Sequence, residues 1–169
     1  HLSIRRQRQM CIRDRCYGAG PAKIGSIVGG SSKEGQVLIN RFLNNMPRFK
    51  NLRNQVIEAA ESGVIKGLDG RLLHIRNSFS ALNTLIQGAG AVVCKQWLVH
   101  MMAEVYASGL DVKLVGSIHD EYQFEVSNQD VKRFTEITKY SMIKTTKTLN
   151  LNCPLDSEHK VGTTWLETH

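Results

Sequence analysis

The sequence lacks any apolar run long enough to cross a membrane. A membrane-spanning helix needs roughly 20 consecutive apolar residues, and no such run occurs in the 169 residues. The charged N-terminal stretch is not followed by the apolar segment of a signal peptide. We therefore expect no membrane anchor and no signal peptide, and a location in the cytoplasm.

Cysteine is also sparse, and its spacing does not resemble a zinc site. The four cysteines form no Cys-x-x-Cys pair and do not adjoin a histidine cluster with the spacing of zinc ligands; they are Cys11, Cys16, Cys94 and Cys153. We expect reduced thiols in an intracellular protein.

Acidic residues are outnumbered, but much of the basic excess lies at the N-terminus. The chain has 22 Lys and Arg against 15 Asp and Glu, a net charge of +7. Residues 1–16 hold five arginines and one aspartate, so they carry +4 and the remaining residues only +3. This balance is compatible with a nucleic-acid partner but also with other soluble proteins.

Residues 1–16 show neither helical nor strand periodicity. A basic nucleic-acid arm is one interpretation. The alternative comes from the genetic code, because residues 10–14 are what ATG-TGT-ATA-AGA-GAC encodes, a transposon end used in sequencing-library preparation. Our hypothesis is that residues 1–16 are a translated adapter and not native, and we assign them no function.

From residue 17 onward, apolar spacing predicts a single mixed fold. Hydrophobic residues make up 41% of the chain, enough to bury a core. Ser31 and Glu34 form a capping-box pattern, and Asp69-Gly70 is a strong hairpin signal. The expected elements are helices over 21–28, 31–47 and 47–63, a ribbon over 64–75, a long helix over 80–108, hairpin strands over 112–118 and 122–126, a helix over 131–140 capped by Ser127 and Asp130, and a strand over 151–158. Helices combined with antiparallel pairing indicate an α+β fold.

The residues between the two hairpin strands, 119–121, are the first candidate for chemistry. Two adjacent carboxylates, Asp120 and Glu121, cannot both enter a core without a large desolvation cost, but both can face a divalent cation and a phosphate. Asp120 is the expected ligand, and Glu121 would assist directly or through water. The alternative is an ordinary solvated turn, although the flanking apolar strands favour a carboxylate held on rigid elements.

Two amide side chains mark one face of the expected long helix. Asn83 and Gln87 are four residues apart, and Gly88 and Gly90 would allow another backbone to approach. Side-chain amides can donate to the acceptors that every base pair shows in the minor groove. The alternative is an amide pair that faces solvent or bonds a neighbouring element.

Five segments in order resemble motifs of the family A DNA polymerases. They are Tyr-Gly-Ala-Gly at 17–20, similar to the end of the fingers helix; Lys-Gly-Leu-Asp-Gly-Arg at 66–71, similar to the palm ribbon; residues 81–88, similar to the long palm helix; Ile-His-Asp-Glu at 118–121, similar to motif C; and Gly-Thr-Thr-Trp at 162–165 with the terminal His169, similar to the ending of phage replicative members. The resemblance covers residues 17–169. It implies distal fingers helices over 17–62 and a polymerase palm, an antiparallel ribbon and sheet with long helices, over 63–169.

The resemblance also implies roles for matching residues. Asp120 resembles the motif C aspartate that binds catalytic metal, with Glu121 as its acidic neighbour and His119 near the primer terminus. DNA contacts are implied for a second set, Tyr17, Asn83, Gln87 and Arg71. The implied reaction is attack of a primer 3′-hydroxyl on a deoxynucleoside triphosphate with two Mg²⁺ ions. The implied partners are primer-template DNA and that triphosphate, with a processivity factor as a candidate partner of the full-length parent, in a bacterial or phage-infected cell.

Two departures limit what the resemblance implies. Phe79 stands where many bacterial members have an Arg, which puts one template contact in doubt. In the family, the motif A aspartate lies further upstream, and the Lys, Arg and aromatic residue of the fingers helix directly precede the residue matched by Tyr17. Residues 1–16 do not contain that pattern. We therefore expect the chain alone to be inactive, because a two-metal mechanism needs more than one aspartate. The alternatives are a non-catalytic duplex-DNA-binding module and an unrelated α+β protein without salt-sensitive DNA binding.

Overall fold

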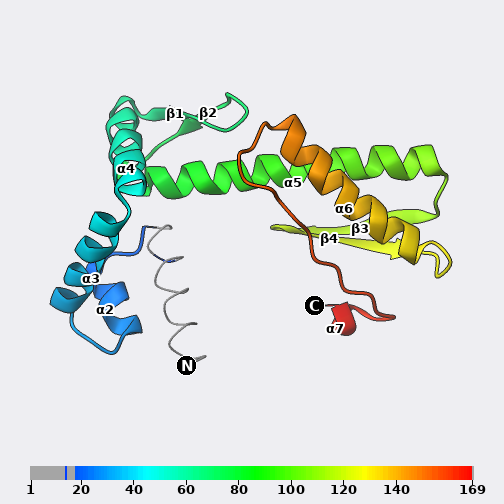
Figure 1. Ribbon diagram of the computed structural model, residues 1–169, viewed down its shortest axis with the longest axis horizontal. Coiled ribbons are helices and arrows are strands. Elements are labelled where there is room, and N and C mark those ends of the chain that lie inside the picture. The colour runs from blue at the N-terminus through cyan, green and yellow to red at the C-terminus, as the bar shows by residue number, and fades with distance from the viewer. Residues whose placement is uncertain (1–13, 15–17, 169) are drawn as a thin grey trace. The chain divides into compact units, whose positions relative to one another are not determined.

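The computed structural model describes residue 14 and residues 18–168, which fall into two compact units (Figure 1). The N-terminal unit is 1–88 and the C-terminal unit is 89–169. Tyr17, His169 and nearly all of the segment 1–16 lie outside the described residues. Helices and two small antiparallel sheets confirm the α+β class. No helix among the described residues is long and apolar enough to cross a bilayer.

Three helices open the N-terminal unit, as the sequence predicts. They are α2 (Pro21–Ile27), α3 (Ser32–Asn45) and α4 (Pro47–Ala59), followed by a 3₁₀ turn, Ala60–Ser62. Proline begins α2 and α4, where its missing N–H costs nothing. The predicted capping box is present: the Glu34 carboxylate accepts from Ser31 N at 2.7 Å, and Glu34 N donates to Ser31 Oγ. These bonds lower the pKa of Glu34.

The α2–α3 pair packs backbone against backbone. A methyl group at Gly35 would collide with the carbonyl oxygen of Pro21, and one at Gly25 would collide with the carbonyl of Ser31. Glycine is therefore required at both positions for this approach. At the corner between α3 and α4, the rings of Phe42 and Phe49 pack edge to face with centroids 5.6 Å apart.

The predicted ribbon follows, with a longer loop than the Asp-Gly signal indicates. Strands β1 (Val64–Lys66) and β2 (Leu72–His74) pair antiparallel. They are joined by residues 67–71, where Gly67 N donates to the Arg71 carbonyl and Gly70 has a φ of 84°. The inward residue of each strand joins a core with α4 and the start of α5; this core contains Val56, Ala60, Ile65, Leu73, Ala81 and Leu82.

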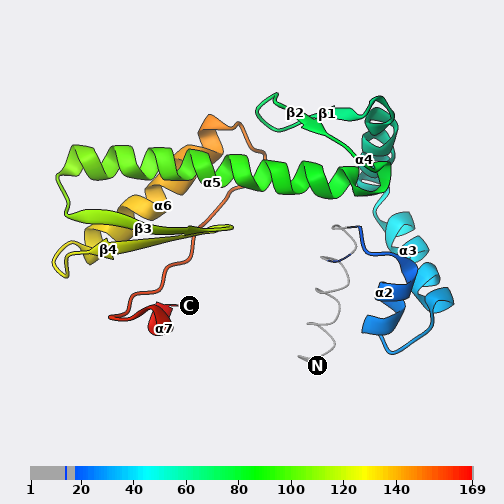
Figure 2. The same cartoon turned by 180° about the vertical axis from the view of Figure 1, so that it is seen from behind.

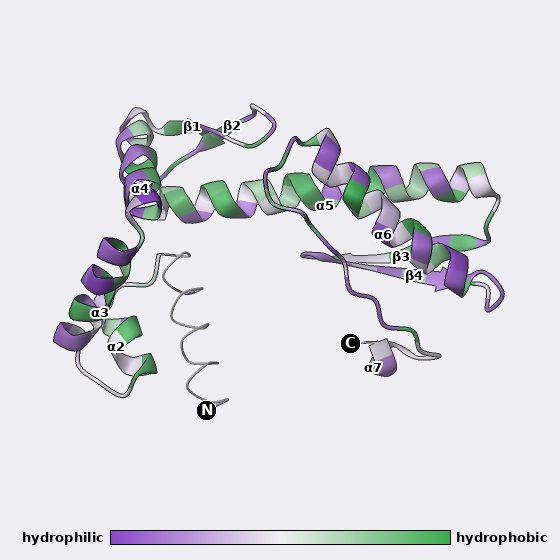
Figure 3. Cartoon of the chain, in the orientation of Figure 1, coloured by the Kyte–Doolittle hydropathy of each residue, from purple (hydrophilic) through white to green (hydrophobic). Residues whose placement is uncertain are grey.

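The long helix α5 (Ala81–Ser108) begins in the N-terminal unit and ends in the C-terminal unit. Figure 3 shows it largely in green, as its apolar sequence predicts. The rest of the C-terminal unit contains β3 (Val112–Ile118), β4 (Glu121–Val126) and α6 (Val131–Thr148), which lie beside the second half of α5 in Figures 1 and 2. Their shared core is built on Met101, Val105, Val112 and Phe134.

The expected strand over 151–158 is wrong. No strand forms there among the described residues; the segment instead runs along α6, where Leu155 N donates to Thr146 Oγ1 at 3.3 Å. Leu151 and Leu155 are half-buried by this contact, so their apolar spacing reflects packing on a helix. A short helix, α7 (Trp165–Thr168), ends the described chain.

Two details of α6 also differ from expectation. Asp130 precedes the helix but makes no side-chain cap; its carboxylate accepts from Asp111 N at 3.3 Å instead. Tyr140, expected on the apolar face, is 55% exposed. The helix continues past Tyr140, the last residue that the apolar pattern marked, to Thr148.

Candidate functional site

The hairpin that carries the acidic residues has a tighter turn than expected. Only His119 and Asp120 lie between the strands, because Glu121 already pairs with Ile118 as the first residue of β4. The expected three-residue turn is therefore wrong by one residue. His119 has a φ of 55°, a left-handed conformation that few residues other than glycine adopt.

Aromatic contacts attach this hairpin to α5 and α6 of the C-terminal unit. Tyr122, two residues after Asp120, packs on Trp97 of α5 with ring centroids 5.6 Å apart. The Trp97 indole N–H donates to the Thr138 carbonyl of α6 at 2.9 Å. Phe124 packs on Phe134 with centroids 4.8 Å apart. The turn therefore extends from strands that are fixed in the core.

The two carboxylates have different surroundings. Glu121 Oε1 accepts a 2.8 Å hydrogen bond from the Gln123 side-chain amide. Side chains alternate along a strand, so Glu121 and Gln123 lie on the face opposite Tyr122, whose ring contacts α5. Asp120 is exposed and makes no hydrogen bond or ion pair with another described residue.

The pKa of Cys94, on α5, depends in part on the charge of Asp120. Burial raises the pKa of the Cys94 thiol, and the negative charge of Asp120 raises it further. Burial and the neighbouring thiol of Cys94 raise the pKa of Tyr122. Asp120 is therefore near enough to Cys94 of α5 for its charge to act on the thiol. Sequence reasoning missed Cys94, although its place beside Val93 and Trp97 on an apolar helix was visible.

The described residues can supply part of a magnesium site. They contain no group of three or more His, Cys, Asp or Glu side chains that could hold a metal ion. Mg²⁺, however, usually binds proteins through one or two carboxylates and takes its other ligands from water and substrate phosphates. An exposed carboxylate on a fixed turn, as at Asp120, fits this mode.

The residues expected to touch DNA belong to the N-terminal unit. Asn83 Oδ1 is buried and has no hydrogen-bond partner among the described residues, whereas Gln87 is exposed. Arg71 is held by Asp69: its Nε donates at 2.8 Å and its Nη2 lies 2.6 Å from the same carboxylate oxygen. This contact raises the pKa of Arg71 and lowers that of Asp69. Phe79 is 75% exposed.

Among the described residues, no other backbone makes the expected approach to Gly88 or Gly90. A Cβ at Gly88 would lie 3.1 Å from Leu73 Cδ1, so this glycine accommodates a side chain of β2. Gly90 has nothing within 4 Å of such an atom. The structure thus places His119 and Asp120 on one turn, with Glu121 beginning the next strand, in the C-terminal unit. The two amides, Asn83 and Gln87, lie on one helix in the N-terminal unit.

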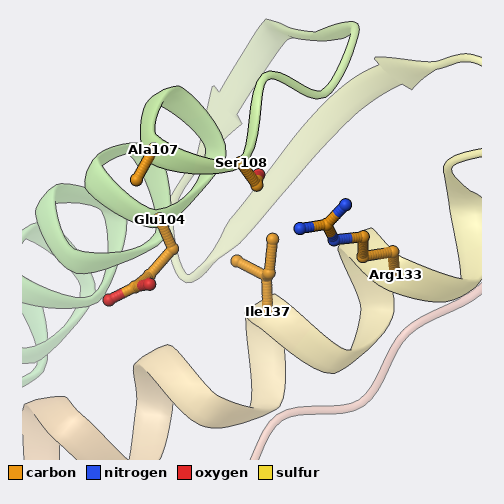
Figure 4. A pocket seen from close by; sticks show the side chains of 5 residues that line it. All are labelled: Glu104, Ala107, Ser108, Arg133 and Ile137. Atoms are coloured by element: carbon orange, nitrogen blue, oxygen red, sulfur yellow. The ribbon is translucent and has the colours of Figure 1, made fainter.

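A small open hollow of about 250 Å³ lies between the end of α5 and α6 (Figure 4). Its lining is Glu104, Ala107, Ser108, Arg133 and Ile137. Glu104 is already paired with Lys144 at 3.0 Å. None of these residues belongs to the candidate site, so we assign the hollow no part in it.

Comparisons with known proteins identify relatives. The model of DNA polymerase family A matches residues 3–167. The chain is 39% identical to a DNA-directed DNA polymerase of Escherichia phage Phieco32 over 160 residues, which cover 90% of the chain and 26% of that protein. It is 34% identical to the DNA-directed DNA polymerase of Escherichia phage T7, covering 90% and 25% respectively.

A solved structure shares the fold. It is the POL domain of Pol1 from M. smegmatis in complex with DNA primer-template and dNTP, with a TM-score of 0.75 and 20% identity. The match covers 84% of this chain and 27% of that one. The chain spans about a quarter of the length of the phage relatives. Because the family model covers nearly all of it, the chain belongs to DNA polymerase family A.

Proposed function

We propose that this chain is the distal fingers and palm of a template-directed DNA polymerase, and that Asp120 binds catalytic Mg²⁺. The observation that supports the assignment of Asp120 is its position: an exposed carboxylate without a competing partner among the described residues, on a turn whose strands are fixed by the Trp97–Tyr122 contact. Rigid support of this kind is what a positioned metal ligand needs.

The reaction assigned to the full-length parent is nucleotidyl transfer. The primer 3′-oxygen forms a bond to the α-phosphorus of a deoxynucleoside triphosphate, the bond to pyrophosphate breaks, and the hydroxyl proton passes to solvent. Bound Mg²⁺ would stabilise negative charge on the attacking and leaving oxygens. Asp120 would hold the ion, Glu121 would assist directly or through water, and His119 would lie beside the primer end.

The N-terminal unit would hold the DNA. Asn83 and Gln87 would donate to minor-groove acceptors that are common to all base pairs. The donating atom of Asn83 would be Nδ2; its Oδ1, which is buried without a partner among the described residues, can only accept a hydrogen bond and takes no part in this donation. Arg71 would contact a phosphate, since its pairing with Asp69 is at the surface and can exchange. Tyr17 would stack where the template base enters. For the full-length parent, the proposal includes a processivity factor as a candidate partner and a location in the cytoplasm.

We further propose that the chain has no polymerase activity alone. The described residues provide no three-group metal cluster, and a two-metal site cannot be assembled from one aspartate. The same observation favours a second candidate, a module that grips duplex DNA without catalysis.

A chimera tests the proposal. Residues 18–169 would replace the matching C-terminal part of the phage T7 polymerase, and primer extension would be measured with Mg²⁺. We expect the isolated chain to be inactive and the chimera to be active, and Asp120→Asn to reduce the chimera's rate by about 10³-fold.

Asp111→Asn is the matched control, because Asp111 is an exposed carboxylate of the same unit, at the start of the hairpin. It should leave the rate nearly unchanged. Extension by the isolated chain would contradict the inactivity. A folded, DNA-binding chimera that remains inactive, or one indifferent to Asp120→Asn, would favour the binding module.

A further inference from the structure

Positive charge is concentrated in the N-terminal unit. Residues 18–88 hold nine Lys and Arg against four Asp and Glu, whereas residues 89–169 hold eight against ten. Residues 18–88 therefore carry a net charge of +5, and residues 89–169 carry −2. A polyanion would be attracted to the first unit and repelled by the second.

Within the N-terminal unit, the segment 35–57 contains no acidic residue. It includes the second part of α3, the corner at Met46 and most of α4. Its four cations, which we call the basic corner, are Arg41, Arg48, Lys50 and Arg53. Broad purple bands mark both helices in Figure 3.

The basic corner is not neutralised within the described chain. Arg41, Arg48 and Lys50 are exposed, and no member of the basic corner makes an ion pair with another described residue. Two other cations of this unit are paired, Lys23 with Asp14 at 3.0 Å and Arg71 with Asp69. Glu34, the acid nearest in sequence, has its carboxylate committed to the capping box with Ser31.

The corner is stiff, and its surface chemistry is suited to phosphates. The Phe42–Phe49 contact fixes the junction of the two helices. Both rings are half-buried against each other, so α3 and α4 present no free aromatic surface for base stacking. Neutral amides, which can donate to phosphate oxygens, are interleaved with the cations; they are Asn40, Asn44, Asn45, Asn51 and Asn54.

We propose that the basic corner binds the phosphate backbone of DNA independently of base sequence. It would add an electrostatic contact outside the motif residues that resemble the family. This inference rests on the proposed function, which makes DNA the polyanion in question. The corner would position DNA on the N-terminal unit without reading or acting on it.

The test is the salt dependence of DNA binding by the 169-residue chain. A triple variant, Arg41→Gln, Arg48→Gln and Lys50→Gln, is compared with the wild type on labelled duplex and single-stranded oligonucleotides of unrelated sequence. Each lost phosphate contact lowers the slope of log K against log salt by about 0.9 for duplex and about 0.7 for single strands. We therefore expect the slope to fall by about 2 to 3, equally for all sequences.

The matched control is Lys132→Gln, Lys139→Gln and Lys147→Gln on α6, which removes the same charge from exposed positions of the acidic unit. It should keep the wild-type slope. Arg41→Lys with Arg48→Lys should also keep it, which separates charge from any change in packing.

The inference would be overturned if the corner variant kept the salt slope of the wild type. It would also be overturned if the α6 control lowered the slope as much as the corner variant does. Either result would leave the proposed function standing. A wild type without salt-sensitive DNA binding would overturn the inference and also count against the proposed function. The far-UV circular dichroism of each variant checks that it is folded.

Discussion

At the scale of single residues, the carboxylates of this chain differ in the hydrogen bonds and ion pairs that their oxygens make. Glu34 closes a capping box, Asp69 holds Arg71 and Glu121 accepts from Gln123. Asp120 has no such bond with a described residue, and its charge is felt by the thiol of Cys94. The surroundings of Asp120 and Glu121 therefore differ, although the two residues are adjacent in sequence.

The pKa of Cys94 should therefore respond to Asp120. Removing the carboxylate charge by Asp120→Asn takes away one of the two causes that raise this pKa, so the thiolate becomes easier to form. The other cause, burial, remains. In a background with the other three cysteines changed to serine, we expect a thiol reagent to modify Cys94 about two to ten times faster below its pKa.

Asp111→Asn in the same background is the control, and its reaction rate should match that of the parent. The difference between Asp120→Asn and its parent should disappear at a pH high enough to ionise the thiol in both. Equal rates of the two at every pH would show that the charge of Asp120 does not act on the Cys94 thiol.

At the scale of elements, the spacing of apolar residues and the residues that begin helices predicted most of the fold. The capping box of α3, the prolines of α2 and α4 and the apolar face of α5 are local signals, and the structure confirms each helix. Elements that depend on a distant neighbour were less predictable. The apolar spacing over 151–158 fits either a strand or a segment lying on α6, and only the tertiary contact at Thr146 decides.

For the candidate site, the sequence could suggest residues but not their geometry. The sequence pointed to His119, Asp120 and Glu121, yet the register of β4, which places Glu121 in the strand, depends on pairing across the whole hairpin. Cys94 is 26 positions from Asp120 in sequence, so no local pattern could reveal their proximity. The same limit applies to Gly88, whose neighbour Leu73 lies on another element.

Two glycines should respond oppositely to alanine. Gly35→Ala places a methyl group against the backbone of Pro21, so α2 and α3 must separate, and we expect a loss of about 1 to 3 kcal/mol in the free energy of unfolding. Gly90→Ala adds a methyl group in open space within α5, and we expect a gain of about 0.5 to 1 kcal/mol from helix propensity.

Chemical denaturation monitored by circular dichroism measures both changes. Both variants make the same substitution, glycine to alanine, so opposite effects on stability must come from the surroundings of the two positions. A Gly35→Ala variant as stable as the wild type would show that α2 and α3 do not pack as closely as described.

At the scale of the whole molecule, charge and chemistry divide between the two units. The N-terminal unit is basic and carries Asn83, Gln87 and the basic corner; the C-terminal unit is acidic and carries Asp120. An acidic region suits cation binding and a basic one suits DNA. The chain spans about a quarter of its phage relatives, and the proposed activity accordingly belongs to the parent.

The central claim is that the side chain of Asp120 coordinates the catalytic ion, and a change of ligand type tests it most directly. Asp120→Cys, in the chimera with the phage T7 polymerase, replaces a hard oxygen with a soft thiolate, which binds Mg²⁺ poorly but binds Mn²⁺ or Cd²⁺ better. Primer extension by this variant should be lost with Mg²⁺ and restored in part by one of the softer ions, while Asp111→Cys stays active with Mg²⁺. Undiminished extension by Asp120→Cys with Mg²⁺ would contradict the claim.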